Sequence, residues 1–143
     1  MRASIPVILF PKLLLIAASL MPSLMSCAPT KPLATAPYVD LDRFMGTWYV
    51  IGTIPTIYDR NAHNSVEVYE RAERGVKIDY SFNSGSLDGK LKTFSARAMI
   101  VDPGLNANWE VTYVTWPFER DYKIIRLEYD YSVAVIGQPS RKN

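Results

Sequence analysis

The fold of this chain is decided by one stretch of its sequence, Asp42-Arg43-Phe44-Met45-Gly46-Thr47-Trp48-Tyr49-Val50-Ile51. Gly46 permits a close approach of the backbone to a neighbouring element because glycine has no Cβ. Two residues later, Trp48 supplies one large apolar side chain, which is suited to plugging the narrow end of a barrel. A tryptophan alone suits an ordinary core equally well, so the interpretation depends on the sequence around it.

From Tyr38 onward the chain breaks into short runs separated by turn signals at intervals of roughly ten residues, which is typical of an antiparallel barrel or sandwich. The strands we predict are 47–54, 64–71, 75–83, 91–101, 109–115, 122–128 and 132–136. In the third and fourth, apolar and polar side chains alternate, as expected for strands with one buried face. The predicted buried side chains of these two strands are Val76, Ile78, Tyr80, Phe82, Phe94, Ala96, Ala98 and Ile100.

Three turn sequences fit hairpin connections between these strands: Glu73-Arg74-Gly75, Asp88-Gly89 and Asp102-Pro103-Gly104. Glycine supplies a positive φ and proline presets its own φ, and both favour tight turns. The alternation indicates an all-β protein, but it does not distinguish a barrel from a sandwich, because both hide one face of each strand.

The composition fits one globular domain, with 143 residues of which 48% are hydrophobic and 21% charged. The formal net charge of +2 comes from Arg2 and Lys12, and the rest of the chain carries 14 basic and 14 acidic side chains. A neutral body without a basic stripe argues against nucleic-acid binding.

The first residues have the layout of a secretory signal: a basic flank, the apolar run 13–20, and small residues before Cys27. The apolar run is too short to span a bilayer, and prolines interrupt any longer helix. The stretch Leu24-Met25-Ser26-Cys27 resembles the lipobox of bacterial lipoproteins. We therefore predict a signal peptide over 1–26 and a proline-rich tether over 27–37 that begins with acylated Cys27. By analogy, Ala28 after this cysteine implies an outer-membrane destination, with the protein facing the periplasm.

The opening stretch, with its G-x-W motif, resembles the first signature of lipocalins. Later segments match the order and spacing of the bacterial (Blc-like) branch: Val101-Asp102-Pro103, Trp116-Pro117-Phe118, Asp121-Tyr122 and the run 129–139. The resemblance implies a lipocalin domain over 38–143, with the fold of an antiparallel up-and-down β-barrel and with Gly46 and Trp48 as structural signature. A complete member continues into an eighth strand and a helix, and the strand carries an Arg that packs over the tryptophan. We therefore expect a fragment or a shortened sequence with seven of the eight strands. The alternative is a barrel closed by something else, such as a second copy in a homodimer, because the open edges invite pairing.

The resemblance implies binding of a fatty acid, a lysophospholipid or a similar small hydrophobic ligand, for lipid storage, transport or envelope maintenance. The side chains we expect to line the lumen, in order of preference, are Ala98, Tyr113, Phe94, Ala96, Tyr80 and Val111, together with Phe82. Small residues leave room, and aromatic ones give apolar surface. Arg97 and Lys92 are candidates for a headgroup contact, although a solvated outer face is the favoured interpretation for both.

An enzyme is not expected. The only cysteine is the predicted acylation site, and the single histidine, His63, has no second histidine or cysteine nearby for metal or triad chemistry, so we expect no catalytic residue, metal or cofactor. Carboxylates such as Asp79, Glu67 and Glu110 are predicted to be solvated. The alternative to a lipid carrier is an envelope lipoprotein whose solid barrel binds a protein partner.

Overall fold

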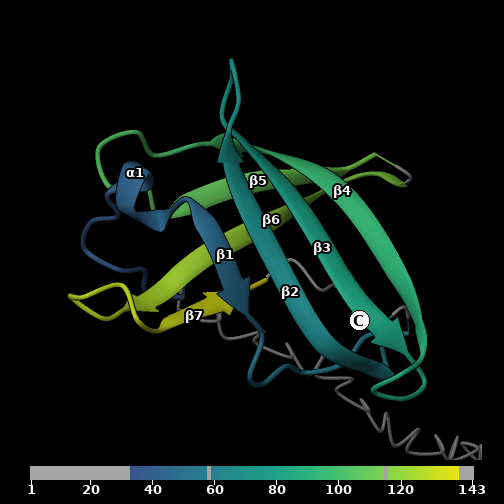
Figure 1. The fold of residues 1–143 in the computed structure, drawn as a ribbon. Helices are drawn as coiled ribbons and strands as arrows, with labels where there is room; N and C mark the ends of the chain where they lie inside the picture. Colours follow the sequence, from purple (N-terminus) through teal and green to yellow (C-terminus); the bar gives the residue numbers. More distant parts are fainter. Residues whose placement is uncertain (1–32, 58, 115, 139–143) are drawn as a thin grey trace, which may run out of the picture. The chain divides into compact units, whose positions relative to one another are not determined.

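Seven antiparallel strands form one curled sheet in which each strand pairs with the next in sequence (Figure 1). This computed structural model describes residues 33–57, 59–114 and 116–138. The elements are α1 (Leu41–Phe44), β1 (Gly46–Tyr49), β2 (Ala62–Arg71), β3 (Val76–Ser84), β4 (Lys90–Ile100), β5 (Asn108–Tyr113), β6 (Trp116–Leu127) and β7 (Ala134–Gly137). The predicted signal peptide (1–26) and Cys27 lie outside the described residues. The predicted all-β, up-and-down architecture is confirmed, with the seven expected strands and the short helical turn before G-x-W.

Strand register explains why one face of the sheet is buried. Ile78 lies opposite Ala96 and Val76 opposite Ala98, so the small side chains of β4 face the branched side chains of β3. Because side chains alternate along a strand, this register places every second residue of both strands on the inner face. The inner and outer sets predicted for these two strands are confirmed.

The two predicted strand boundaries that differ most from the structure do so for local reasons. The first strand ends at Tyr49 rather than at residue 54, because the chain then leaves the sheet after one last hydrogen bond, from the Val50 N–H to the Ser65 carbonyl at 2.9 Å. The sixth strand begins at Trp116 rather than at residue 122, so Pro117 lies inside a strand. A register irregularity at Thr112 and Tyr113 accompanies it, and irregular pairing is where sheets tolerate proline.

The loops of the sheet gather at two ends, because the strands run alternately up and down. One end, the closed end, carries α1, the β2–β3 turn, and the β4–β5 and β6–β7 loops (Figure 1). The segment before α1 also lies there, since the Ala36 N–H donates to the Ile124 carbonyl at 2.8 Å and the Val39 N–H to the Leu105 carbonyl at 2.9 Å. The other end, the open end, carries the β1–β2, β3–β4 and β5–β6 loops.

The apolar core lies toward the closed end, where Val39, Phe44, Tyr69 and Trp109 are almost completely buried. Among the described residues, no helix has the length and apolar character needed to cross a membrane. The sheet is therefore packed most tightly at its closed end.

Candidate ligand-binding site

The inner face of the sheet carries all seven side chains that the sequence predicts to line the lumen. Strand pairing sets six of them opposite one another: Tyr80 and Phe94, Ala96 and Tyr113, and Ala98 and Val111. Phe82 is the next inward residue after Tyr80, and its ring lies 5.4 Å from the Tyr80 ring. Contact of any of these residues with a ligand stays a prediction.

Five of the seven residues fall into two groups by their position along the lumen. Ala96, Ala98 and Val111 belong to the packed core near the closed end and expose at most 3% of their surface. Nearer the open end, Phe82 and Phe94 stack with ring centres 5.9 Å apart, and Phe94 is only half-buried. Phe94 therefore borders open space, whereas Phe82 beside it exposes only 2% of its surface and the Ala98 group fills the core.

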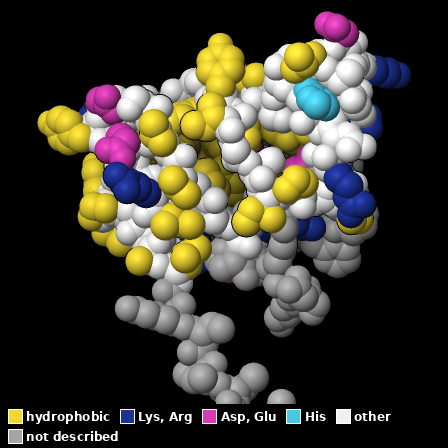
Figure 2. All heavy atoms as spheres, turned by 90° about the horizontal axis from the view of Figure 1, so that it is seen from below, with side chains coloured by type: hydrophobic (Ala, Val, Ile, Leu, Met, Phe, Trp, Pro, Cys, Tyr) yellow, Lys and Arg dark blue, Asp and Glu magenta, His cyan; other side chains and the backbone are white. Residues whose placement is uncertain are grey.

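A view from below Figure 1 shows a deep hollow whose walls are mostly hydrophobic (Figure 2). Apolar side chains on the open-end loops are also strongly exposed. We call these residues the rim: Ile51, Ile54, Ile57, Leu87 and Val114. Exposed apolar side chains in one region of a small domain are typical of a binding surface.

Five aromatic side chains close the bottom of the lumen, and we call them the floor: Phe44, Trp48, Tyr69, Trp109 and Tyr122. Phe44 lies against Trp48 at 4.9 Å and edge-on to Tyr69 at 5.2 Å between ring centres. Trp109 packs edge-on to Phe44 and stacks on Tyr122. The Trp48 indole N–H donates to the Phe44 carbonyl at 2.9 Å, which fixes the ring of the G-x-W motif over α1.

The floor also contains a carboxylate that the sequence-based prediction placed in solvent. Glu67 lies on the inner face, on the same side of β2 as buried Tyr69, and its Oε2 accepts hydrogen bonds from the hydroxyls of Tyr69 and of Tyr122, the latter at 3.0 Å. The two hydroxyls also contact each other. The prediction of a solvated Glu67 was wrong because it placed this carboxylate on the polar face of its strand, whereas the register of β2 with β3 turns it inward, opposite Tyr80. Tyr69, which shares the face of Glu67, was the available signal.

Burial, followed by the Glu67 charge, holds the pKa of Tyr69 well above its ordinary value. Burial likewise raises the pKa of Tyr122, with Tyr69 and Glu67 contributing. The pKa values of Tyr80 and Tyr113 are also raised, by burial first, and the charge of Glu67 adds to both. Four inward tyrosines thus respond to one carboxylate, and all four keep their hydroxyl protons at neutral pH.

The two basic side chains considered for a headgroup lie on different faces. Arg97 is exposed on the outer face. Lys92, in contrast, pairs with Phe82, and its ammonium lies 5.9 Å from the centre of the Phe82 ring at the open end. Lys92 is exposed to solvent, as predicted, but the predicted outer-face position is wrong, because its parity matches that of inward Phe94.

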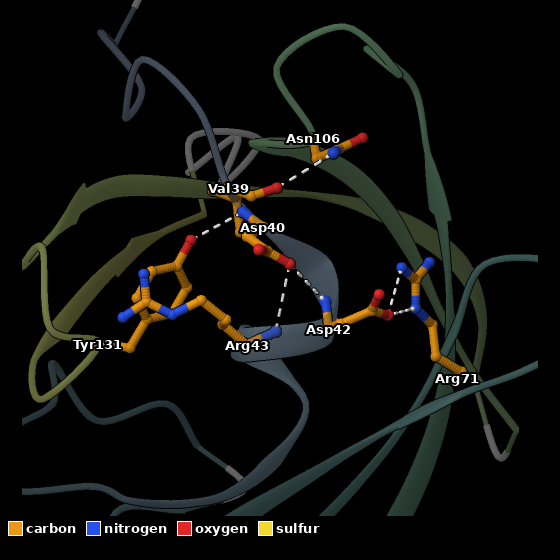
Figure 3. A network of polar contacts seen from close by, with 7 residues as sticks. All are labelled: Val39, Asp40, Asp42, Arg43, Arg71, Asn106 and Tyr131. Carbon is orange, nitrogen blue, oxygen red and sulfur yellow. Dashed lines mark hydrogen bonds and ion pairs between the residues drawn. The ribbon is translucent and has the colours of Figure 1, made fainter.

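The helix α1 is held to the barrel by polar contacts that start at its N-cap (Figure 3). The Asp40 carboxylate accepts from the N–H groups of Asp42 and Arg43 at 3.0 and 3.3 Å, and the Asp40 N–H donates to the Tyr131 hydroxyl at 2.7 Å. The Arg43 guanidinium lies 4.1 Å from the centre of the Tyr131 ring. This side of α1 is thereby fixed to the β6–β7 loop.

Two further contacts tie the same region to other parts of the sheet (Figure 3). Arg71, at the end of β2, pairs with the Asp42 carboxylate at 2.8 Å. The Asn106 amide, in the β4–β5 loop, donates to the Val39 carbonyl at 3.0 Å. Contacts from three elements therefore position Phe44, and with it the floor.

A shallow pocket of about 240 Å³ lies away from the lumen and is lined by Val101, Asp102, Asn108, Trp109, Asp121 and Lys123. Its polar groups bond to one another: the Asn108 amide donates to Asp102 at 3.0 Å, and Lys123 donates to Asn108 at 2.9 Å. This pocket therefore offers few free groups to a ligand, and the lumen is the better candidate.

The site thus combines a curled antiparallel sheet, an aromatic floor that includes the tryptophan of the G-x-W motif, and an apolar lumen. A family model described as a lipocalin-like domain matches residues 39–143. The chain belongs to the lipocalin-like family. Lipocalins are in general binding proteins that take small hydrophobic ligands into the barrel, and the match covers all seven strands. No curated protein matches the chain.

Proposed function

We propose that this lipocalin is a membrane-anchored lipoprotein of the bacterial envelope that binds a lipid in its lumen. The ligand is a fatty acid, a lysophospholipid or a similar amphiphile, and the task is lipid storage, transport or envelope maintenance. The observation that carries the proposal is the hollow with mostly hydrophobic walls (Figure 2), together with the aromatic floor. A chain-like apolar ligand gains about 25 cal/mol for each Å² that it removes from water there.

The rim supports the same proposal. Ile51 and Ile54 expose 92% and 81% of their surface, although both are strongly apolar. A ligand that leaves a lipid phase for the lumen passes these side chains, so an apolar rim shortens its exposure to water. Phe94 and Phe82 then continue the apolar surface inward.

The anchor is proposed from the sequence. The lipobox-like stretch before Cys27 favours acylation, and each buried methylene of an acyl chain contributes ~0.8 kcal/mol to membrane binding. An anchored barrel stays close to the bilayer that supplies its ligand. Mass measurement of the mature N-terminal peptide tests this part separately: an acylated Cys27 is expected, and an unmodified chain that retains residues 1–26 contradicts it.

Native mass spectrometry of the Cys27→Ser chain, followed by organic extraction, tests the ligand. The expected result is a mass shift that releases a fatty acid or lysophospholipid. A folded protein that binds no lipid, whether as purified or after incubation with lysophospholipid, contradicts the proposal and favours a barrel that binds a protein partner. The same spectrum reports whether two copies pair through β1 and β7, the edge strands of the described sheet.

A matched pair of variants locates the binding surface. Phe94→Ala removes an apolar ring from the inner face of β4, and Leu91→Ala removes an exposed apolar side chain from its outer face. We expect the first to weaken lipid binding roughly tenfold and the second to leave it unchanged. Equal effects of the two substitutions contradict binding in the lumen.

A further inference from the structure

The floor of the lumen holds an unexplained polar group, the carboxylate of Glu67. Burying a carboxylate among aromatic rings is costly unless it is paired or hydrogen-bonded. Tyr69 and Tyr122 supply two hydrogen bonds, and both go to Oε2. Within the described part of the chain, no donor reaches Oε1 and no basic side chain forms an ion pair with Glu67.

The second oxygen of Glu67 is open to the lumen. Among the described residues, every fully buried side-chain oxygen has a hydrogen-bond partner. Oε1 of Glu67 has no partner, so this oxygen is not fully buried. Because Glu67 projects from the inner face of β2, opposite Tyr80 and Trp48, the accessible side is the lumen.

We define the Glu67 cluster as Glu67, Tyr69 and Tyr122. It offers more hydrogen-bond acceptor positions than donor hydrogens. The two hydroxyls carry one hydrogen each, and both are engaged when they donate to an ionised Glu67. The hydroxyl oxygens and Oε1 then keep free lone pairs. A ligand that brings its own hydrogens satisfies them, whereas a ligand carboxylate brings only further acceptors and a like charge.

Two basic side chains of inward parity lie nearer the open end than Glu67, whereas Arg71, which shares the parity of Tyr69, is paired with Asp42 at the closed end. Lys92 is over the Phe82 ring, and Arg120, half-buried opposite Val111, is two residues closer than Tyr122 to the start of β6. Along the lumen, positive charge therefore comes first and the negative charge of Glu67 lies at the bottom. Of these charges only that of Glu67 attracts a cation, so a ligand ammonium is stabilised at the floor and not beside Lys92 or Arg120.

We propose that the Glu67 cluster is a binding site for the ammonium group of an amine-bearing amphiphile, whose apolar chain extends from the floor toward the rim. The ammonium donates to Oε1 of Glu67 and lies among the faces of aromatic rings that also attract cations. This inference rests on the proposed lipid-binding function and adds to it the chemical class and the orientation of the ligand.

Calorimetric titration of the Cys27→Ser chain at neutral pH with octylamine, octanol and octanoate tests the proposal. The three probes share one apolar chain and differ only in the terminal group. We expect octylamine to bind at least about tenfold more tightly than octanoate, with octanol between them, because hydrogen bonds to charged groups contribute about 1.5–3 kcal/mol. Octanoate binding as tightly as octylamine overturns the proposal.

The variant Glu67→Gln keeps the shape and removes the charge. We expect it to weaken octylamine binding by about tenfold and to leave octanol within about threefold. The control Glu110→Gln removes the same charge from the exposed outer face of β5 and is expected to change neither affinity. An equal loss for all three probes in Glu67→Gln means that Glu67 is only structural, which overturns the inference.

The two proposals fail in distinguishable ways. If wild type binds octanol and octanoate without preferring octylamine, the ammonium site is wrong and the lipid-binding function stands. If no probe and no lipid binds, both are wrong. Should Glu67→Gln fail to fold, as judged by circular dichroism, the order of the three wild-type affinities alone decides.

Discussion

The closed end of this barrel holds the buried apolar core, although its β6–β7 loop also exposes Tyr129, whereas the open-end loops carry several exposed isoleucines and no such core. At the closed end, Phe44 and Trp109 each expose 1% of their surface, while at the open end Ile51 and Ile54 are almost fully exposed. The closed end is held by an N-capped helical turn, an ion pair and loop-to-loop hydrogen bonds (Figure 3). Because most buried contacts lie where the barrel is plugged, we expect stability to be concentrated at the closed end and to be lower at the open end.

The strongest way to break this comparison is Trp109→Ala. The indole packs on Phe44 and Tyr122 and donates to the Asn106 carbonyl at 2.8 Å, so its removal leaves a large cavity in the floor. We expect the free energy of unfolding to fall by about 3–5 kcal/mol in urea denaturation. At the open end, Ile57→Ala is expected to change it by less than about 0.5 kcal/mol. Similar losses in the two variants would mean that the ends do not differ in stability.

Two glycines sharpen the same contrast. Gly75, in the β2–β3 turn of the closed end, has φ +76°, and a Cβ there would lie 1.9 Å from the Ala98 carbonyl oxygen. We expect Gly75→Ala to cost at least about 2 kcal/mol, measured by the shift in thermal unfolding. A Cβ at Gly52, in the β1–β2 loop, would meet no other atom within 4 Å. For Gly52→Ala we expect a change below about 0.5 kcal/mol.

Alkaline pH should weaken the floor selectively. The pKa values of Tyr69 and Tyr122 are raised well above 10.0, chiefly by burial, so above this pH the unfolded chain loses protons that the folded protein keeps. Stability should therefore fall as pH rises, by about 1.4 kcal/mol per pH unit for each tyrosine, until the folded pKa is passed. Tyr122→Phe should make the fall shallower. An unchanged slope of unfolding free energy against pH would contradict the role of these hydroxyls.

The smallest expected effect is that of Ile54→Ser on stability. The side chain is exposed, so the free energy of unfolding should change by less than about 0.5 kcal/mol. Transfer of a lipid from vesicles should nevertheless slow down, because the rim loses apolar surface. Stopped-flow transfer assays measure this, with Ser86→Thr, in the β3–β4 loop, as a polar control. An unchanged transfer rate would show that the rim takes no part in lipid entry.

Much of the fold was predictable because its signals are local. Alternation in β3 and β4 placed Phe82, Phe94 and Ala98 on one face, and strand pairing kept them there. The end of β1 was not predictable in this way, since residues 50–54 are as apolar as a strand but do not pair continuously with a neighbouring strand. Whether a segment pairs depends on a second segment, and the local sequence pattern carries no information about that second segment.

The apolar residues that line the walls of the candidate site could be predicted from the sequence, but the carboxylate in its floor could not. Apolar lining follows from alternation, so Tyr80, Phe94 and Tyr113 were found from the sequence. Glu67 was missed because a carboxylate between two valines resembles an outward residue of a half-buried strand. Only the juxtaposition of β2 with β6 brings Tyr122 within hydrogen-bond distance of it.

The sequence by itself determined the strand order, the inward face of the central strands and the motif that begins the barrel, because backbone alternation and turn chemistry act over a few residues. Only the tertiary structure decided which inward residues fill the core, which border the lumen, and that a carboxylate lies at its floor. Those outcomes depend on contacts between segments that lie far apart in the sequence. Glu67 and Tyr122, for example, are separated by 55 residues. The physical reason is that the burial of a side chain is set by the whole sheet once it curls.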